Sequence, residues 1–158
     1  MQFFPYVLFL HIFGAILAFG PTYAYSIGGA MGGREPQHAN FNARVGAATG
    51  SKLVYPLAIL QGITGLALVL ITGINILSHA WLTVAILLYL GAITYALTIQ
   101  RNTLHQVIEM TSTPPPAGAT GGPPPALMAA VRRLQMGGMG LGLTVAVIVF
   151  LMVVKPGG

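Results

Sequence analysis

The stretch "LVYPLAILQGITGLALVLITGINILSHAWLTVAILLYLGAITYALTI", residues 53–99, holds two apolar runs on either side of the short turn "SHAW". Each run is close to the roughly 20 residues that a helix needs to cross about 30 Å of hydrocarbon. Lipid offers no hydrogen-bond partners to an open backbone, so both runs are expected to be helices. The tight turn predicts that the two helices form an antiparallel hairpin.

Two further apolar runs lie toward the ends of the chain. Of the 158 residues, 55% are hydrophobic and 6% are charged, whereas a soluble domain has about 25% charged residues. The sequence therefore predicts an all-α membrane protein, a four-transmembrane-helix antiparallel bundle in the lipid bilayer with residues 1–158 as a single integral membrane domain. The net charge of +5 is too sparse to indicate nucleic-acid binding. The predicted helices cover residues 3–27, 53–77, 80–104 and 127–154, all approximate.

The connections predict the orientation of the bundle. Residues 28–52 form a predicted Gly-rich loop, and residues 111–126 form a predicted tether with six prolines and three glycines. The side with these two connections holds most of the basic residues: Arg34, Arg44, Lys52, Arg101, Arg132 and Arg133. The other side holds only Lys155. Basic residues favour the cytoplasmic side, so we expect a multi-pass inner-membrane protein with both long connections in the cytoplasm and both termini outside.

His11 lies inside the first apolar run. Small residues recur with it at helical spacing, among them Gly14 and Ala18, so this face is expected to point into the bundle. An ionisable residue within a span is a functional hypothesis by default. A neutral imidazole suits haem iron or a divalent metal, so haem b or a metal at His11 is one hypothesis, with His79 of the turn as a second metal ligand. A hydrogen bond from His11 to a neighbouring helix is the other.

Gln61 is the second polar group that needs an explanation. An unpaired amide inside a span costs several kcal/mol, so its side chain requires a partner. One interpretation is a hydrogen bond between helices, and the other is a ligand pocket that Gln61 shares with Tyr89 or Tyr95 of the third span. Pro56 lacks a backbone N–H, which predicts a kink near the start of the second span.

The residue types favour a protein that is not an enzyme. The chain has no cysteine, and Glu35 and Glu109, its only acidic residues, lie outside the predicted spans. The spans therefore contain no pair of carboxylates for acid–base chemistry. Faces with small residues, such as Gly138 with Gly142, predict close helix packing, either within the bundle or in a homo- or hetero-oligomer.

The opening "LHIFGAILAFG", residues 10–20, the four spans and the closing "FLMVVKPGG", residues 150–158, resemble a bacterial family of predicted integral membrane proteins of unknown function. That family is similar to the CopD copper-resistance proteins and the HemJ-type protoporphyrinogen oxidases. This resemblance implies that His11, in the first-span "LHI", is a haem ligand. It also implies a lysine shortly after the tryptophan of the third span, but here Trp81 is followed by residues such as Thr83 and Ala85.

Three functional hypotheses follow. The first is a non-enzymatic accessory or small-ligand-binding bundle. The second is a haem-binding redox membrane protein with His11 as an axial ligand. The third is a small permease whose path is lined by Gln61, Tyr89 and Tyr95. A visible absorption spectrum of the purified protein separates the first two.

Overall fold

The computed structural model describes residues 2–113 and 122–157, and every regular element in these two ranges is helical. The elements form four rods in chain order. The first rod is α1 (Phe4–Arg34) and the last is α6 (Pro125–Val154). The second rod joins α2 (Ala39–Thr49), the π-helical turn η2 (Gly50–Val54) and α3 (Tyr55–Thr72). The third joins α4 (Ala80–Tyr95), the π-helical turn η4 (Ala96–Gln100) and α5 (Arg101–Met110).

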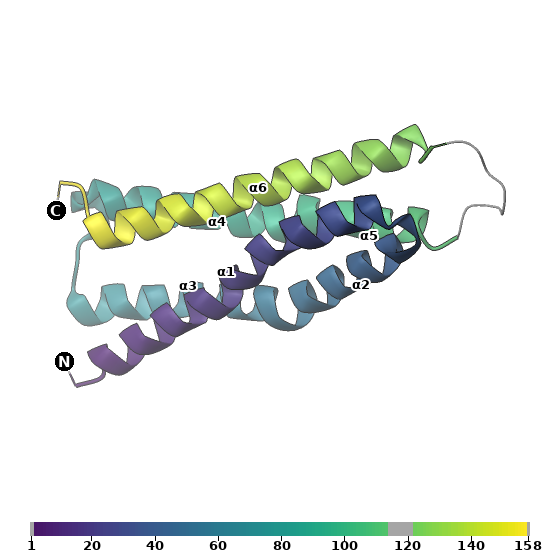
Figure 1. Cartoon of the computed structure of the whole chain (residues 1–158). Helices are drawn as coiled ribbons and strands as arrows, with labels where there is room; N and C mark the ends of the chain where they lie inside the picture. Colours follow the sequence, from purple (N-terminus) through teal and green to yellow (C-terminus); the bar gives the residue numbers. More distant parts are fainter. Residues whose placement is uncertain (1, 114–121, 158) are drawn as a thin grey trace.

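All four rods are long and apolar enough to cross a membrane, which confirms the predicted all-α class with four membrane-spanning helices. Consecutive rods run in opposite directions, so both ends of the chain and the turn between α3 and α4 lie at one end of the molecule (Figure 1). A short 3₁₀ turn, η3 (Ile76–Ser78), makes the connection there. The second rod ends at Thr72, earlier than predicted, because Gly73 takes a left-handed conformation with φ 67° that stops the helix.

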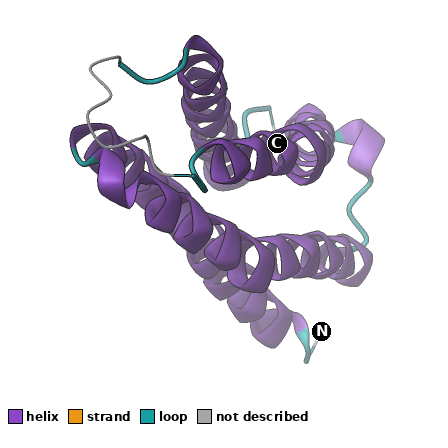
Figure 2. Ribbon diagram, turned by 90° about the vertical axis from the view of Figure 1, so that its right-hand side faces the viewer, coloured by secondary structure: helices purple, strands orange, loops and turns teal. Residues whose placement is uncertain are grey.

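The rods are arranged as two pairs. The first pair is α1 packed along α3, and the second is α4 packed along α6. The pairs meet at the end away from the termini, where α2 contacts α5, and they lie apart at the end with the termini (Figures 1 and 2). Small side chains such as Ala18 and Ala85, which are 0% and 1% exposed, fill the contacts between helices. The buried core of the protein therefore consists of narrow contacts between pairs of helices.

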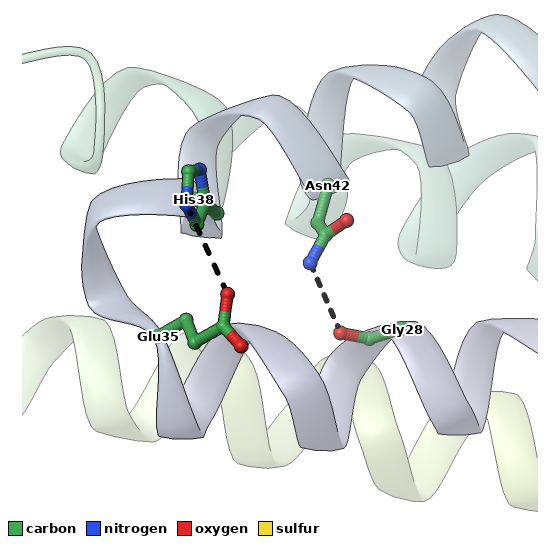
Figure 3. A network of polar contacts seen from close by, with 4 residues as sticks. All are labelled: Gly28, Glu35, His38 and Asn42. Carbon is green, nitrogen blue, oxygen red and sulfur yellow. Dashed lines mark hydrogen bonds and ion pairs between the residues drawn. The ribbon is translucent and has the colours of Figure 1, made fainter.

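The structure corrects the predicted loop over residues 28–52. α1 continues through the glycines to Arg34, the 3₁₀ turn η1 (Pro36–His38) follows, and α2 begins at Ala39. A glycine inside a helix costs about 1 kcal/mol relative to alanine, but here α2 folds back along the end of α1. The Asn42 side chain donates a hydrogen bond of 3.4 Å to the Gly28 carbonyl, and His38 lies 3.8 Å from Glu35 (Figure 3). Tertiary contacts thus keep this Gly-rich segment helical.

The rods extend beyond the predicted spans at the end away from the termini. The third rod continues to Met110 rather than stopping near residue 104. The second covers Ala39–Thr72, 34 residues or about 51 Å of helix, which exceeds the about 30 Å of a hydrocarbon core. α6 begins at Pro125, inside the predicted tether over 111–126, and residues 114–121 of that tether lie outside the described residues.

The two π-helical turns interrupt the second and third rods at similar positions. Pro56 stands just after η2 and has no N–H with which to bond the Lys52 carbonyl, so the regular α-helical ladder cannot close there. A kink was expected here, and the structure has the π-helical turn directly before Pro56. Each π-helical turn changes the direction in which the side chains that follow it point.

Candidate functional site

His11 faces α3 and contacts two of its polar residues. Its Nδ1 lies 2.8 Å from Thr64 Oγ1, and its Nε2 lies 3.1 Å from Gln61 Nε2. The Thr64 hydroxyl donates to the main-chain carbonyls one turn back, at 3.0 and 3.1 Å, so it accepts from His11 Nδ1–H. The Gln61 amide then donates to His11 Nε2. The ring is therefore a neutral imidazole with a hydrogen bond at each nitrogen. We call His11, Gln61 and Thr64 the polar cluster.

Glycines make room for the polar cluster. A Cβ on Gly65 of α3 would lie 3.2 Å from His11 Cε1, and a Cβ on Gly14 of α1 would lie 3.2 Å from Gln61 Oε1. Gln61 is 9% exposed, and its Oε1 has no hydrogen-bond partner in the part of the chain that the structure describes. A buried acceptor left unpaired costs about 1–3 kcal/mol. This oxygen can therefore still accept a hydrogen bond.

The two candidate tyrosines of the third rod lie in different contacts. Tyr89 packs on Gly62 of α3, and its hydroxyl donates a hydrogen bond of 2.8 Å to the Ala58 carbonyl. Gly62 directly follows Gln61 in α3, and the hydroxyl proton of Tyr89 is already donated to a main-chain carbonyl. Tyr95 faces the other way, because a Cβ on Gly137 of α6 would overlap its hydroxyl. The structure therefore places Tyr89 on Gly62, the residue after Gln61, and Tyr95 between α4 and α6.

His79 contacts a separate set of residues. Its Nδ1 lies 3.0 Å from the Asn75 carbonyl, and its ring meets the edge of Trp81 at 6.3 Å between centroids. The Lys155 ammonium lies 5.6 Å from the Trp81 ring centre, so this end of the bundle carries a small aromatic and cationic cluster. Within residues 2–113 and 122–157, no three His, Cys, Asp or Glu side chains gather as a metal site.

The contacts of His11 bear directly on the haem hypothesis. An axial ligand needs one ring nitrogen with a free lone pair. Here the Nε2 lone pair accepts from Gln61, and Nδ1 carries the proton that is donated to Thr64. The side chains as they stand do not fit haem ligation, since Gln61 would first have to leave the ring.

Sequence reasoning did not predict the tyrosine contacts. Tyr23 of α1 packs 3.6 Å from the Cβ position of Gly142 and donates to its carbonyl at 3.3 Å. Tyr25 of the same helix donates to the Gly46 carbonyl at 3.4 Å. With Tyr89 on Gly62, this gives a repeated arrangement in which a glycine of one helix receives a tyrosine of another. The small-residue face of α6 that includes Gly142 is therefore used inside the chain, and this face was the sequence signal for such contacts.

The comparisons with known proteins place the chain in a family. The model of the family DUF2269, described as a predicted integral membrane protein, matches residues 5–156. The chain therefore belongs to this family of integral membrane proteins, whose function is unknown. No curated protein and no solved structure matches it.

Proposed function

We propose that this member of the DUF2269 family is a non-enzymatic accessory subunit of the membrane, a bundle that packs against other membrane helices and holds at most a small ligand. The observation that carries this proposal is the polar cluster. Both nitrogens of His11 are engaged by α3, so the histidine joins α1 to α3 and offers no free atom for chemistry. Its role is to hold the first helix pair together.

The outer face of α6 supports an accessory role. No residue in the most apolar 18-residue stretch of this helix is buried within the chain. A Cβ on Gly140 would meet nothing within 4 Å, and its neighbours Met139 and Leu143 are 64% and 67% exposed. A small residue on an exposed face lets a second backbone approach closely, which is how membrane helices associate. We propose this face as the contact with a second copy or another membrane protein.

A glycine substitution tests the oligomer. Gly140→Leu should fill the space on α6 and convert the extracted complex to its monomeric mass. Gly91→Leu is the matched control, because Gly91 is also open, on α4, with nothing within 4 Å of a Cβ. Native mass spectrometry from nanodiscs measures both. A wild-type protein that is monomeric throughout would contradict the accessory role.

The small ligand of this proposal would bind at the polar cluster. Gln61 Oε1 is the unpaired acceptor there, so a small molecule with an N–H or O–H donor matches it. The permease hypothesis has less support, because Tyr95 packs against α6 and does not continue a path from Gln61 and Tyr89.

An absorption spectrum of the purified protein distinguishes our proposal from the haem-binding alternative. The proposal expects purified protein without a Soret band, both in the wild type and in His11→Ala. A stoichiometric haem in the wild type that disappears in His11→Ala, while far-ultraviolet circular dichroism shows an intact helical fold, would replace our proposal with the redox hypothesis. The resemblance to HemJ-type proteins implies that His11 of the first-span "LHI" is a haem ligand, and it would gain weight from that result.

We further propose a location in the bacterial cytoplasmic membrane with both termini outside. The basic residues at the end away from the termini support it, because Lys and Arg concentrate on the cytoplasmic side. A reporter fused after Lys155 should be active only outside, and one inserted between Thr113 and Gly122 should be active only inside. Activity of both reporters in the cytoplasm would contradict this orientation.

A further inference from the structure

A cavity of about 360 Å³ lies between the second and third rods, beside both π-helical turns. The second rod contributes Ser51, Lys52 and Tyr55 to its lining, and the third contributes Arg101, Leu104 and His105. We call it the basic cavity. Two exposed cations, two hydroxyl groups and an imidazole therefore line one open space between the two rods.

The positive charge of the basic cavity is not neutralised by the protein. The chain has only two acidic residues, Glu35 and Glu109. In the described ranges, the one ion pair joins Glu35 to His38. Lys52 and Arg101 therefore face the basic cavity with no carboxylate partner, and an anion is the ligand that balances them.

The level of the basic cavity along the membrane-spanning rods indicates which kind of anion it binds. Lys52 lies about 20 residues before Thr72, the end of its rod, and Arg101 lies about 20 residues after Ala80, the start of its own. At about 1.5 Å per residue, both cations are about 30 Å from the turn that joins the rods. This is the thickness of a hydrocarbon core, so the two cations stand at the level of the phosphate groups of one leaflet.

The π-helical turns help to bring the two cations to the same space. Lys52 lies within η2, and Arg101 directly follows η4. A π turn adds one residue to the helical ladder, which rotates the side chains that follow by about 100° relative to an uninterrupted helix. Such turns are frequent at functional sites. Two of them at one level of facing rods are consistent with a site that is built into the fold.

We propose that the basic cavity binds the phosphate group of an anionic membrane phospholipid. The Arg101 guanidinium provides two parallel donors that match phosphate oxygens, and the Lys52 ammonium adds a second charge. The hydroxyl of Tyr55 supplies a neutral donor, and Leu104 gives an apolar wall. Basic pockets between membrane helices on one leaflet bind headgroups of this kind. The lipid site does not depend on the accessory role proposed above.

Native mass spectrometry of the full-length protein in neutral detergent tests the site. The probes are phosphatidylglycerol, zwitterionic phosphatidylcholine and inorganic phosphate, each titrated separately. We expect one tightly retained phosphatidylglycerol, and binding weaker by about tenfold or more in the double variant Lys52→Gln/Arg101→Gln, since the loss of even one hydrogen bond between charged groups lowers an affinity by about that factor. The control Arg132→Gln/Arg133→Gln removes the same charge at a similar level of α6, outside the cavity, and should lower the affinity less than about threefold.

The other outcomes overturn the proposal. Equal losses in the two double variants would show diffuse attraction to the basic end and no site at the basic cavity. Equal retention of phosphatidylcholine would exclude charge recognition, and tighter binding of inorganic phosphate would identify a soluble anion as the ligand. If Lys52→Gln/Arg101→Gln fails to fold, Arg101→Lys preserves the charge but removes the paired donors, and it should still weaken phosphatidylglycerol binding severalfold. Unchanged binding in that variant would also refute the site.

Discussion

The contact between Gly62 and Tyr89 makes the substitution Gly62→Ala the sharpest test of the packing. A Cβ at this position would lie 2.5 Å from the Tyr89 hydroxyl oxygen and 3.0 Å from Cζ, so the ring must move. Such overpacking costs about 1–3 kcal/mol. The displaced hydroxyl also loses its 2.8 Å bond to the Ala58 carbonyl, which adds about 0.6 kcal/mol for an interhelical bond in lipid. Relative to Gly91→Ala, which shares the gain in helix propensity, we expect the free energy of unfolding of Gly62→Ala to be lower by about 1.5–3.5 kcal/mol.

Reversible unfolding in mixed micelles with a rising fraction of dodecyl sulfate, followed by circular dichroism, measures this loss. Gly91→Ala is the matched control, because a Cβ there meets nothing within 4 Å, and its effect should stay within about 1 kcal/mol, the scale of a glycine-to-alanine change in a helix. Adding Tyr89→Phe to Gly62→Ala removes the oxygen at 2.5 Å and should restore part of the stability. Equal stabilities of Gly62→Ala and Gly91→Ala, with no recovery from Tyr89→Phe, would refute the reasoning.

Three further predictions use the same unfolding assay. His11→Ala removes two hydrogen bonds to α3 and should lower the free energy of unfolding by about 0.6–2 kcal/mol, with partial recovery in His11→Gln. An unchanged stability of His11→Ala would contradict the role of His11 in holding α1 to α3. Lys155 has φ 47° and lies over Trp81, so Lys155→Ala should be less stable than Lys155→Gly by about 1 kcal/mol, because only glycine tolerates that backbone at no cost; the reverse order would contradict this. Asn40 donates to the Ile108 carbonyl at 2.9 Å and to Thr111, so Asn40→Ala should destabilise by about 1 kcal/mol, whereas Asn42→Ala, with one bond of 3.4 Å, should cost less.

Hydropathy was enough to predict the spans, because a bilayer leaves an apolar segment no choice but a helix. The same logic anticipated that polar groups inside the spans must find partners. His11 and Gln61 were singled out separately for that reason, and in the structure they are partners of each other. A solvent without hydrogen bonds makes the sequence highly informative about such pairs.

The sequence did not predict α2 or the basic cavity, because both depend on contacts between segments that are distant in the chain. The helix α2 contains glycine, asparagine and threonine, which are poor helix formers on their own. Its position is fixed by bonds such as Asn40 to the Ile108 carbonyl, nearly 70 residues away in sequence. The basic cavity arises in the same way, since Lys52 and Arg101 meet only when two rods align. Neither contact leaves a local pattern in the sequence.

The contacts that polar side chains of the third rod make with α6 have a consequence for biosynthesis. The Gln100 amide donates to the Leu134 carbonyl at 2.9 Å, and Tyr95 packs on Gly137. Both partners belong to α6, which leaves the ribosome after α1–α5. Until α6 inserts, the amide of Gln100 lacks this acceptor, and the side of Tyr95 that packs on Gly137 has no partner helix. A nascent chain that ends before Pro125 therefore displays polar groups to membrane quality control, and we expect a membrane protease to remove it much faster than the full-length chain.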